Sequence, residues 1–331
     1  MRRILRDLPG PDLAAQTEVV QRQAELTKPP GSLGRLEELA EWLAAWQGRG
    51  SPRIEHPRIA VFAGTHGVAR RGVSAYPPEV TVQMVKNFVD GGAAINQLAG
   101  AIDADLRIYE LDLAHPTEDF TQAPAMSEAR AAQAMAYGMM TAESGIDVLC
   151  LGEMGIANTT SAAALCAALF GGTGADWAGP GTGVAGAALA NKIAVIDEAL
   201  ARHKDLIAAR DPLMLLAAVG GEELAAIAGA VLAARVGRIP VLLDGYVCTA
   251  AAAVLHAFDR HALDHCRVAH RSAEPGHRRL VEAIGQRPLL EMDMRLGEGS
   301  GAALAVPILK AACACHNGMA TFASAGVSGK V

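Results

Sequence analysis

The sequence is poor in aromatic and charged residues and has no block of basic residues. Aromatic residues make up 4% of the 331 residues, Asp, Glu, Lys and Arg together make up 19%, and the net charge is −6. Proteins that bind nucleic acid use basic tracks along the phosphates and aromatic platforms for the bases. We therefore expect no nucleic acid partner.

Long apolar runs, an export signal and paired cysteines are missing as well. No stretch approaches the ~18 uncharged apolar residues of a membrane span. Asp7, Pro9 and Pro11 interrupt the apolar stretch near the N-terminus, so it does not resemble a signal peptide. The six cysteines form no CxxC pair, which is typical of reduced core cysteines. We expect a cytoplasmic protein with no membrane association.

Hydrophobic residues, in contrast, make up 51% of the chain, and many lie in short runs that end in glycine or a polar turn. These runs predict strands at residues 58–63, 106–111, 147–151, 213–219, 240–244, 266–270 and 289–294. Helices are predicted at residues 12–47 with one interruption, 78–98, 127–142, 158–170, 185–208, 222–236 and from 249 onward. Such alternation predicts an α/β fold with a mostly parallel sheet, whose strand ends form one cleft.

Two glutamates stand in glycine turns that follow predicted strands. Glu298 lies between Gly297 and Gly299, and Glu153 lies in the segment Gly152–Gly155. Two carboxylates over one cleft suggest a general base and a second group that stabilises a cation or binds hydroxyls. The alternatives are a tight turn with a solvated Glu298 and, at the second turn, simple capping of a helix by Asn158, Thr159 or Thr160.

The glycine loop 179–186, GPGTGVAG, contains a GxGxxG match but follows no predicted strand, so it is not a dinucleotide fingerprint. Its amides, with Lys192, could hold one phosphate. GxSxG, Walker lysine and HExxH motifs do not occur, which removes the common hydrolases, P-loop NTPases and zincins.

Histidines offer a weaker signal. His66 lies at a predicted strand end, either as a site residue or as a structural histidine bonded to backbone. His261 and His265 have one-turn helical spacing, but their charged neighbours suit a solvated helix end better than a metal site. We expect no metal.

Eight segments together resemble one family. They are LTKPPGSLGRLEELA (26–40), GTHGVARRGVSAYPPEVTVQMV (64–85), GEMGIANTTSAAAL (152–165), LANKI (189–193), VGGEELAAIAGA (219–230), PVLLDGY (240–246), AHRSAEPG (269–276) and MRLGEGSGAALA (294–305). In this order they resemble the nicotinate-nucleotide–dimethylbenzimidazole phosphoribosyltransferases, which act in the lower-ligand branch of cobalamin synthesis.

The resemblance implies transfer of phosphoribose from nicotinate mononucleotide to 5,6-dimethylbenzimidazole, with inversion at C1′. The products are α-ribazole 5′-phosphate and nicotinate. Glu298 matches the general base, and Glu153 matches a second acidic position near the ribose. Nicotinate leaves as a neutral ring with a carboxylate, so no metal or other cofactor is implied. The substrate-binding positions implied or expected are Lys192, Gly181, Gly183, Ser272, Gly155, Asn158, Thr159, Arg295, Leu296, Gly297, His66, Tyr76 and Met84.

The resemblance also implies a doubly wound parallel sheet with helices on both faces, and a homodimer with sites near the interface. Residues 1–56 and 307–331 would contribute a small helical domain, and residues 57–306 the large α/β domain.

Two departures from the family pattern leave substrate contacts open. Pro180 stands where relatives often have Arg, with Ala185 and Gly186 in place of acidic residues. Tyr76 and Met84 stand where some members carry Ser and Gln, which makes the base pocket more apolar. The alternatives are the same chemistry on adenine, another benzimidazole or a phenol, a nucleotide-binding regulator without turnover and, more remotely, a Rossmann oxidoreductase.

Overall fold

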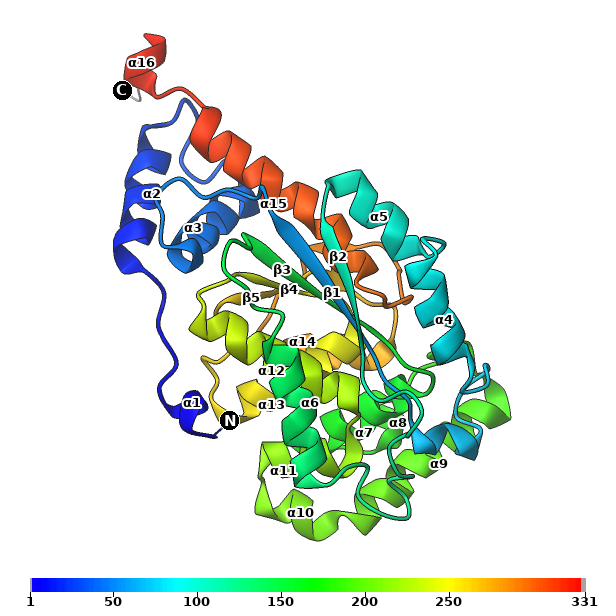
Figure 1. The fold of residues 1–331 in the computed structure, drawn as a ribbon. Helices are drawn as coiled ribbons and strands as arrows, with labels where there is room; N and C mark the ends of the chain where they lie inside the picture. Colours follow the sequence, from blue (N-terminus) through cyan, green and yellow to red (C-terminus); the bar gives the residue numbers. More distant parts are fainter. Residues whose placement is uncertain (1, 329–331) are drawn as a thin grey trace.

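The computed structural model describes residues 2–328 of the chain. Five parallel strands form the central sheet in the order β2-β1-β3-β4-β5 (Figure 1). Their bounds are β1 Pro57–Ala63, β2 Asp105–Glu110, β3 Val148–Met154, β4 Val241–Leu243 and β5 Cys266–Val268. This order has the expected doubly wound topology, in which connections from β1 and β3 leave in opposite directions.

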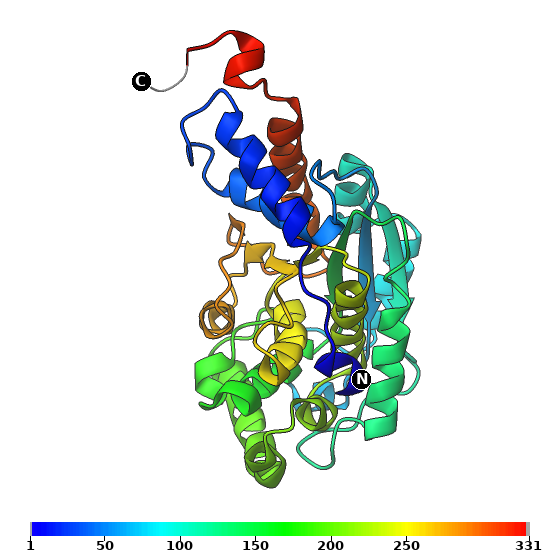
Figure 2. The same ribbon diagram turned by 90° about the vertical axis from the view of Figure 1, so that its left-hand side faces the viewer.

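Helices cover both faces of the sheet (Figures 1 and 2). On one face lie α6 Glu128–Met139, α7 Asn158–Phe170, α11 Pro212–Val219, α12 Glu222–Val236 and α13 Tyr246–Phe258. On the other lie α3 Arg35–Gln47, α4 Val80–Val89, α5 Ala94–Ile102 and α15 Ser300–Gly318. Strand side chains alternate between the two cores: Ala60 and Phe62 face the first, Ile59 and Val61 the second.

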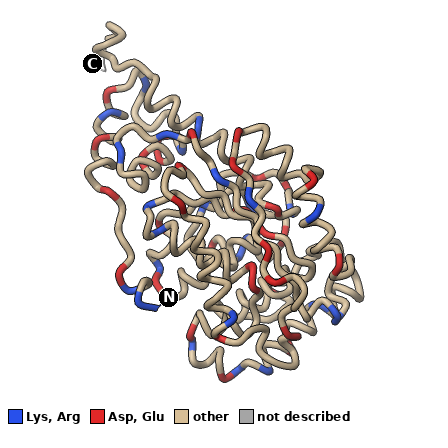
Figure 3. Tube along the Cα trace, in the orientation of Figure 1, with Lys and Arg blue, Asp and Glu red and all other residues tan. Residues whose placement is uncertain are grey.

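The remaining elements are short or peripheral. They are α1 Arg2–Arg6, α2 Leu13–Glu25, η1 Gly67–Arg71, α8 Gly174–Trp177, α9 Gly186–Arg202, α10 Lys204–Ala209, α14 Pro275–Ala283, α16 Phe322–Ala325, β6 His270–Arg271 and β7 Leu290–Glu291. None of the helices within residues 2–328 is both long and apolar enough to cross a membrane. Figure 3 shows lysines and arginines interspersed with aspartates and glutamates along this trace.

Small side chains explain how so few aromatic residues suffice for a large core. Helices α6 and α12 touch through their backbones, because a Cβ atom on Gly138 would collide with the carbonyl of Ala226. A Cβ atom on Gly229 would likewise collide with the carbonyl of Met135. Alanine and glycine therefore let the helix backbones pack closely, so the core is filled without large side chains.

Two predicted strands were wrong. Residues 213–219 form α11, which begins where Asp211 accepts hydrogen bonds from the amides of Leu213 and Met214 at 3.1 and 3.3 Å. A short apolar run does not separate a buried helix from a buried strand, and here the aspartate cap decides. Residues 289–294 form no buried strand of the main sheet. Only β7 is extended, pairing with β6, and Met292 is 56% exposed.

The segments outside the sheet pack at its periphery. Helices α2 and α3 pack on α15, which runs unbroken through residue 306 (Figure 1). Helix α1 lies apart from them: Leu5 joins the core of the α12 face, and Arg2 forms an ion pair with Asp211 at 2.7 Å. The division at residues 56 and 306 therefore stays a prediction.

Candidate active site

A cavity of about 700 Å³ opens at the carboxyl ends of β3, β4 and β5, beside the chain that follows β1. Ligands bind at this edge in open parallel sheets, where the connections diverge. The cavity is lined by Tyr76, Val80, Met84, Glu153, Met154, Gly155, Ile156, Asn158, Thr159, Gly181, Thr182, Gly245, Tyr246, Val247, His270, Ser272, Glu274, Arg295, Leu296, Gly297 and Glu298.

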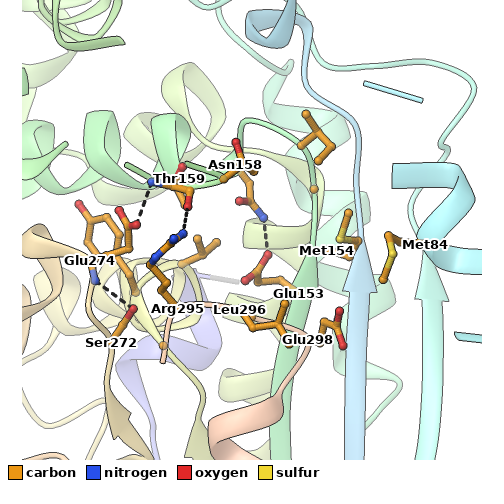
Figure 4. Close-up of a pocket in the computed structure, with 18 of the residues that line it drawn as sticks. Met84, Glu153, Met154, Asn158, Thr159, Ser272, Glu274, Arg295, Leu296 and Glu298 are labelled. Atoms are coloured by element: carbon orange, nitrogen blue, oxygen red, sulfur yellow. Dashed lines mark hydrogen bonds between the residues drawn. The ribbon is translucent and has the colours of Figure 1, made fainter. Parts of the chain in front are cut away.

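Most of the residues expected from the sequence meet in this cavity. Glu298, Glu153, Gly181, Ser272, Gly155, Asn158, Thr159, Arg295, Leu296, Gly297, Tyr76 and Met84 all line it. Lys192 lies just behind the wall, and neither Gly183 nor His66 is among the lining residues. Figure 4 shows methionines at one end of the cavity, Ser272 and Glu274 at the other, and the two glutamates between them.

The Glu298 turn has an unusual backbone. Gly297, Glu298 and Gly299 have φ angles of 87°, 62° and 81°, so three consecutive residues adopt the left-handed conformation. For a residue with a Cβ atom this costs about 1–2 kcal/mol. The amide of Glu298 donates to the carbonyl of Glu153 at 3.1 Å, and its carboxylate Oε2 accepts from the amide of Ile95 at 3.3 Å. Glu298 is 4% exposed, so the solvated-glutamate alternative is wrong.

Asp244, which the sequence analysis did not single out, supports this turn. It directly follows β4. Its carboxylate accepts hydrogen bonds from the amides of Gly299, Gly301 and Ala302 at 3.1, 2.7 and 3.0 Å. These amides begin α15 and would otherwise lack partners. Asp244 thereby fixes the start of α15 directly after Glu298. The sequence signal that could have identified Asp244 is its place at the end of a predicted strand, in PVLLDGY.

Glu153 occupies a regular strand, in contrast to Glu298. It lies near the carboxyl end of β3, and its Oε2 accepts a hydrogen bond from the side chain of Asn158. Helix α7 begins after Ala157, which has φ 78° and makes no side-chain cap bond. The Asn-Thr-Thr segment is therefore not a capping group: Asn158 bonds to Glu153, and Thr159 accepts from Lys192 at 2.8 Å.

Burial and neighbouring charges raise the pKa values of these acids. Burial raises the pKa of Glu153 to about 8, assisted by the charges of Asp244, Glu223 and Glu298, while the bond from Asn158 opposes the rise. Burial also raises the pKa of Asp244 to about 7, against the effect of its three amide donors. The pKa of Glu298 is raised by burial and by Asp244, with the amide of Ile95 acting against them. At neutral pH Glu153 is therefore mostly protonated, and Asp244 is about half protonated.

The glycine loop closes the polar end of the cavity. The amide of Gly181 donates to Glu274 Oε1 at 2.8 Å, and its carbonyl accepts from Arg295 Nη1 at 2.7 Å. Lys192 is fully buried, and its Nζ donates to Thr159 and to the carbonyl of Gly179 at 2.8 and 2.9 Å. Burial lowers the pKa of Lys192 to about 8, partly offset by Glu274. Glu274, in AHRSAEPG, was the second residue that sequence reasoning missed.

The histidines singled out from the sequence lie elsewhere, although His270 lines the cavity. His66 Nε2 is paired with Glu223 at 2.5 Å and its Nδ1 with Ser161 at 3.1 Å, all fully buried side chains beneath the Gly155 turn. Its partners are side chains rather than backbone. His265 is buried and bonds to the carbonyl of Val231 at 2.9 Å, whereas His261 is 60% exposed at its side chain, so the two do not share a solvated helix end.

The opposite end of the cavity is apolar. Val80, Met84 and Met154 are half-buried there, and Tyr76 and Leu296 are 56% and 57% exposed at the rim. The site therefore has an apolar end, a row of acids and an end with a glycine loop and a lysine. Such a cavity suits a substrate that joins a flat ring to a phosphorylated sugar.

Comparison with known proteins agrees with this arrangement. A family model described as phosphoribosyltransferase matches residues 8–327, which places the chain in that class of enzymes. A protein of Brucella anthropi is 56% identical over 99% of this chain and 96% of its own length, and one of Rhizobium etli is 57% identical over the same shares. Both are named nicotinate-nucleotide–dimethylbenzimidazole phosphoribosyltransferase.

The solved structure of CobT from Thermus thermophilus superimposes with a TM-score of 0.90 at 42% identity, covering 96% of this chain and all of that one. A second structure from the same organism, titled as the nicotinate-nucleotide–dimethylbenzimidazole enzyme, has a TM-score of 0.89 at 41% identity. The chain belongs to the nicotinate-nucleotide–dimethylbenzimidazole phosphoribosyltransferase family.

Proposed function

We propose that the protein transfers the phosphoribosyl group of nicotinate mononucleotide to 5,6-dimethylbenzimidazole with inversion at C1′. The products are α-ribazole 5′-phosphate and nicotinate. The names of the relatives supply the substrates, and the two-ended cavity fits them. The observation that carries the proposal is the buried Glu298 between the apolar end and the glycine loop. Its carboxylate accepts from the amide of Ile95, and its own amide donates to the carbonyl of Glu153.

In this proposal the apolar end takes the acceptor ring. One ring nitrogen attacks C1′ from the face opposite the departing nicotinate, and positive charge builds on the ring. Glu298 removes the proton from the other nitrogen. The bond from Ile95 engages Oε2 of Glu298, and Oε1 accepts no hydrogen bond from residues 2–328, so it is available to the acceptor.

Glu153 takes a different role. With a pKa of about 8 it is protonated at neutral pH, so it does not serve as the base. Asn158 holds one of its oxygens, and the protonated carboxyl can donate to a ribose hydroxyl. Lys192, Gly181 and Ser272 take the phosphate end, with Lys192 supplying charge from behind the loop.

The reaction is tested with purified protein and nicotinate mononucleotide. Nicotinate is expected to appear only when a benzimidazole is added, and in equal amount to the new nucleotide, as measured by chromatography. Binding of nicotinate mononucleotide in a calorimeter without any product at saturating benzimidazole would instead support a regulator that lacks turnover.

A different acceptor is the second candidate, and the pocket wall favours testing it. Tyr76, Met84 and Met154 offer mainly apolar contact, so few donors orient the base. A competition assay with equal concentrations of 5,6-dimethylbenzimidazole, benzimidazole, adenine and a phenol measures the ratio of products. Preference for a base other than dimethylbenzimidazole would change the proposed acceptor but not the proposed reaction type.

We further propose a homodimer. Val82 and Val89 of α4 are 51% and 73% exposed, and the apolar side chains of Tyr76 and Leu296 are exposed where they line the cavity. Light scattering during size-exclusion chromatography is expected to give twice the chain mass. A Val89→Glu substitution should shift the mass toward the monomer.

A further inference from the structure

We propose that Glu274 occupies the anion position of the glycine loop and that a nucleotide phosphate binds there only as Glu274 takes up a proton. The inference rests on the proposed function in one respect: it takes the phosphate of nicotinate mononucleotide to bind at the glycine loop. It adds a residue, Glu274, whose protonation state determines the affinity for the phosphate.

The loop holds the Glu274 carboxylate as such loops hold an anion. Glu274 Oε1 accepts the amide of Gly181 at 2.8 Å, Gly181 has a φ angle of 52°, and both residues line the cavity. Backbone amides turned inward in this way form anion-binding concavities. Glu274 is 4% exposed, and within residues 2–328 its Oε2 has no hydrogen-bond partner although it is buried.

The surroundings of Glu274 are those of a phosphate site. Lys192 of α9 lies behind the loop, where a Cβ atom on Gly181 would be 2.9 Å from its Nζ. Arg295, in the segment before Glu298, holds the loop from the other side at the Gly181 carbonyl. Tyr246 of α13 also faces Glu274, with its hydroxyl engaged by the carbonyl of Trp177. Two cations thus face one carboxylate across a glycine loop.

The position of Glu274 is fixed by the chain on either side. Its amide donates to Ser272 Oγ at 3.3 Å, and Pro275 begins α14 immediately afterwards. A Cβ atom on Gly179 would collide with Glu274 Oε2, so the loop and the carboxylate are in close contact. A phosphate that binds at the Gly181 amide would therefore lie directly against the Glu274 carboxyl, which has no room to swing away from the loop.

Two adjacent anions in a buried site repel one another, and protonation of the carboxyl removes the repulsion. Burial already raises the pKa of Glu274, while Lys192, the Gly181 amide and Arg295 restrain the rise. A bound phosphate would raise this pKa further. Above the pKa of Glu274 in the free protein, binding must then bring a proton, and affinity falls by up to about tenfold per pH unit. Below that pKa the proton is already present and the dependence disappears.

The test is calorimetric titration of nicotinate mononucleotide into the full-length protein from pH 6 to 8.5. At each pH, buffers with different ionisation enthalpies give the number of protons taken up. The variants are Glu274→Gln, which removes the charge and keeps an acceptor oxygen, and Glu282→Gln on the same helix. Glu282 is the control because its side chain is 73% exposed.

Wild-type protein and Glu282→Gln are expected to take up one more proton than Glu274→Gln at the upper end of this range. Glu274→Gln is expected to bind the nucleotide about tenfold or more tightly at pH 8, one pH unit of linkage. Ionisation of the phosphate is common to all three proteins and cancels in the difference. Ionisation of Lys192 does not cancel, because Glu274 raises the pKa of Lys192, so the difference is also read at pH 7, below that pKa of about 8. Nicotinate riboside, which lacks the phosphate, should show no gain.

Weaker binding by Glu274→Gln would overturn the inference, because the carboxylate would then be a ligand for the substrate. Equal proton uptake in all three proteins, or an equal gain with the riboside, would overturn it too. Should Glu274→Gln fail to fold, Glu274→Ala, which frees the Gly181 amide, answers the same question. No nucleotide binding by any of the proteins would count against the proposed function itself.

Discussion

Glu153 and Glu298 each follow a glycine at the rim of one cavity, yet their backbones and surroundings differ. Glu153 belongs to a regular strand and its carboxyl is held by the side chain of Asn158, whereas Glu298 adopts a left-handed conformation and its carboxylate accepts from the amide of Ile95. Burial raises the pKa of both, that of Glu153 to about 8, and three neighbouring acids add to the rise at Glu153 but only Asp244 at Glu298. One sequence pattern thus produces two carboxyls whose pKa values are both raised, but by different surroundings.

The sharpest way to break this comparison is to replace the carboxyl at each position by an amide in turn. Glu298→Gln is expected to reduce kcat by about 10²–10⁴-fold, the usual contribution of a general base. Nicotinate release at saturating substrates measures it, and a melting curve controls for folding. A variant that keeps more than a tenth of the activity would remove the base assignment from Glu298.

The backbone of the Glu298 turn gives the next largest effect. Gly297→Ala forces an alanine to φ 87° and places its Cβ atom 2.6 Å from Oε1 of Glu153. Gly285→Ala is the matched control, since Gly285 has φ 67° with nothing within 4 Å of the added atom. Both should lose about 1–2 kcal/mol of stability. Only Gly297→Ala should also lose turnover, by about 10- to 100-fold, because the two glutamates are displaced.

Equal activity of the two alanine variants would show that the contact between the Gly297 turn and Glu153 is not needed. Chemical denaturation gives the stability of each variant, and kcat at saturating substrates gives its turnover.

How far the sequence could predict this site differs between the two turns. Helix α7 and the start of strand β3 were predicted closely, because a buried run, a glycine and a helix follow one another. The strand continues through Met154, however, so Glu153 lies in the strand and not in the glycine turn expected there. The strand expected before Glu298 was wrong, since Met292 and Asp293 are exposed and the chain loops across the cavity. The supports of Glu298 could not be predicted: the amide of Ile95 is a backbone group 203 residues away in the chain. Asp244 and Glu274 are single carboxylates without periodicity, and only their burial distinguishes them.

Glu153→Gln should have a much smaller effect than the same change at Glu298. At pH 7 the wild-type carboxyl is already neutral, so the amide resembles it and kcat should fall by less than about tenfold. The pH profile carries the sharper prediction. The protonated form is the working one, so wild-type kcat should fall as pH rises through about 8, and this fall should be absent in Glu153→Gln.

Saturating nucleotide is needed in that experiment, because Lys192 also has a pKa of about 8 and a bound phosphate keeps it protonated. A loss at Glu153→Gln as large as that at Glu298→Gln would mean that Glu153 works as an anion, and the contrast between the turns would fail.

The smallest expected effect concerns the bond that separates the two environments. Asn158 donates to the carboxylate of Glu153 and so lowers its pKa against the stronger effect of burial. Asn158→Ala should therefore move the high-pH fall in kcat to still higher pH, while Asn158→Asp, which adds a like charge, should move it further in the same direction. Turnover at pH 7 should change by only a few-fold, about the effect of one hydrogen bond of ~1 kcal/mol.

A shift of the high-pH fall in kcat to lower pH would mean that a group other than Glu153 causes this fall. Because Glu298 has no comparable side-chain donor within residues 2–328, its low-pH limb should stay where it is in both variants, which separates the titration of one turn from that of the other.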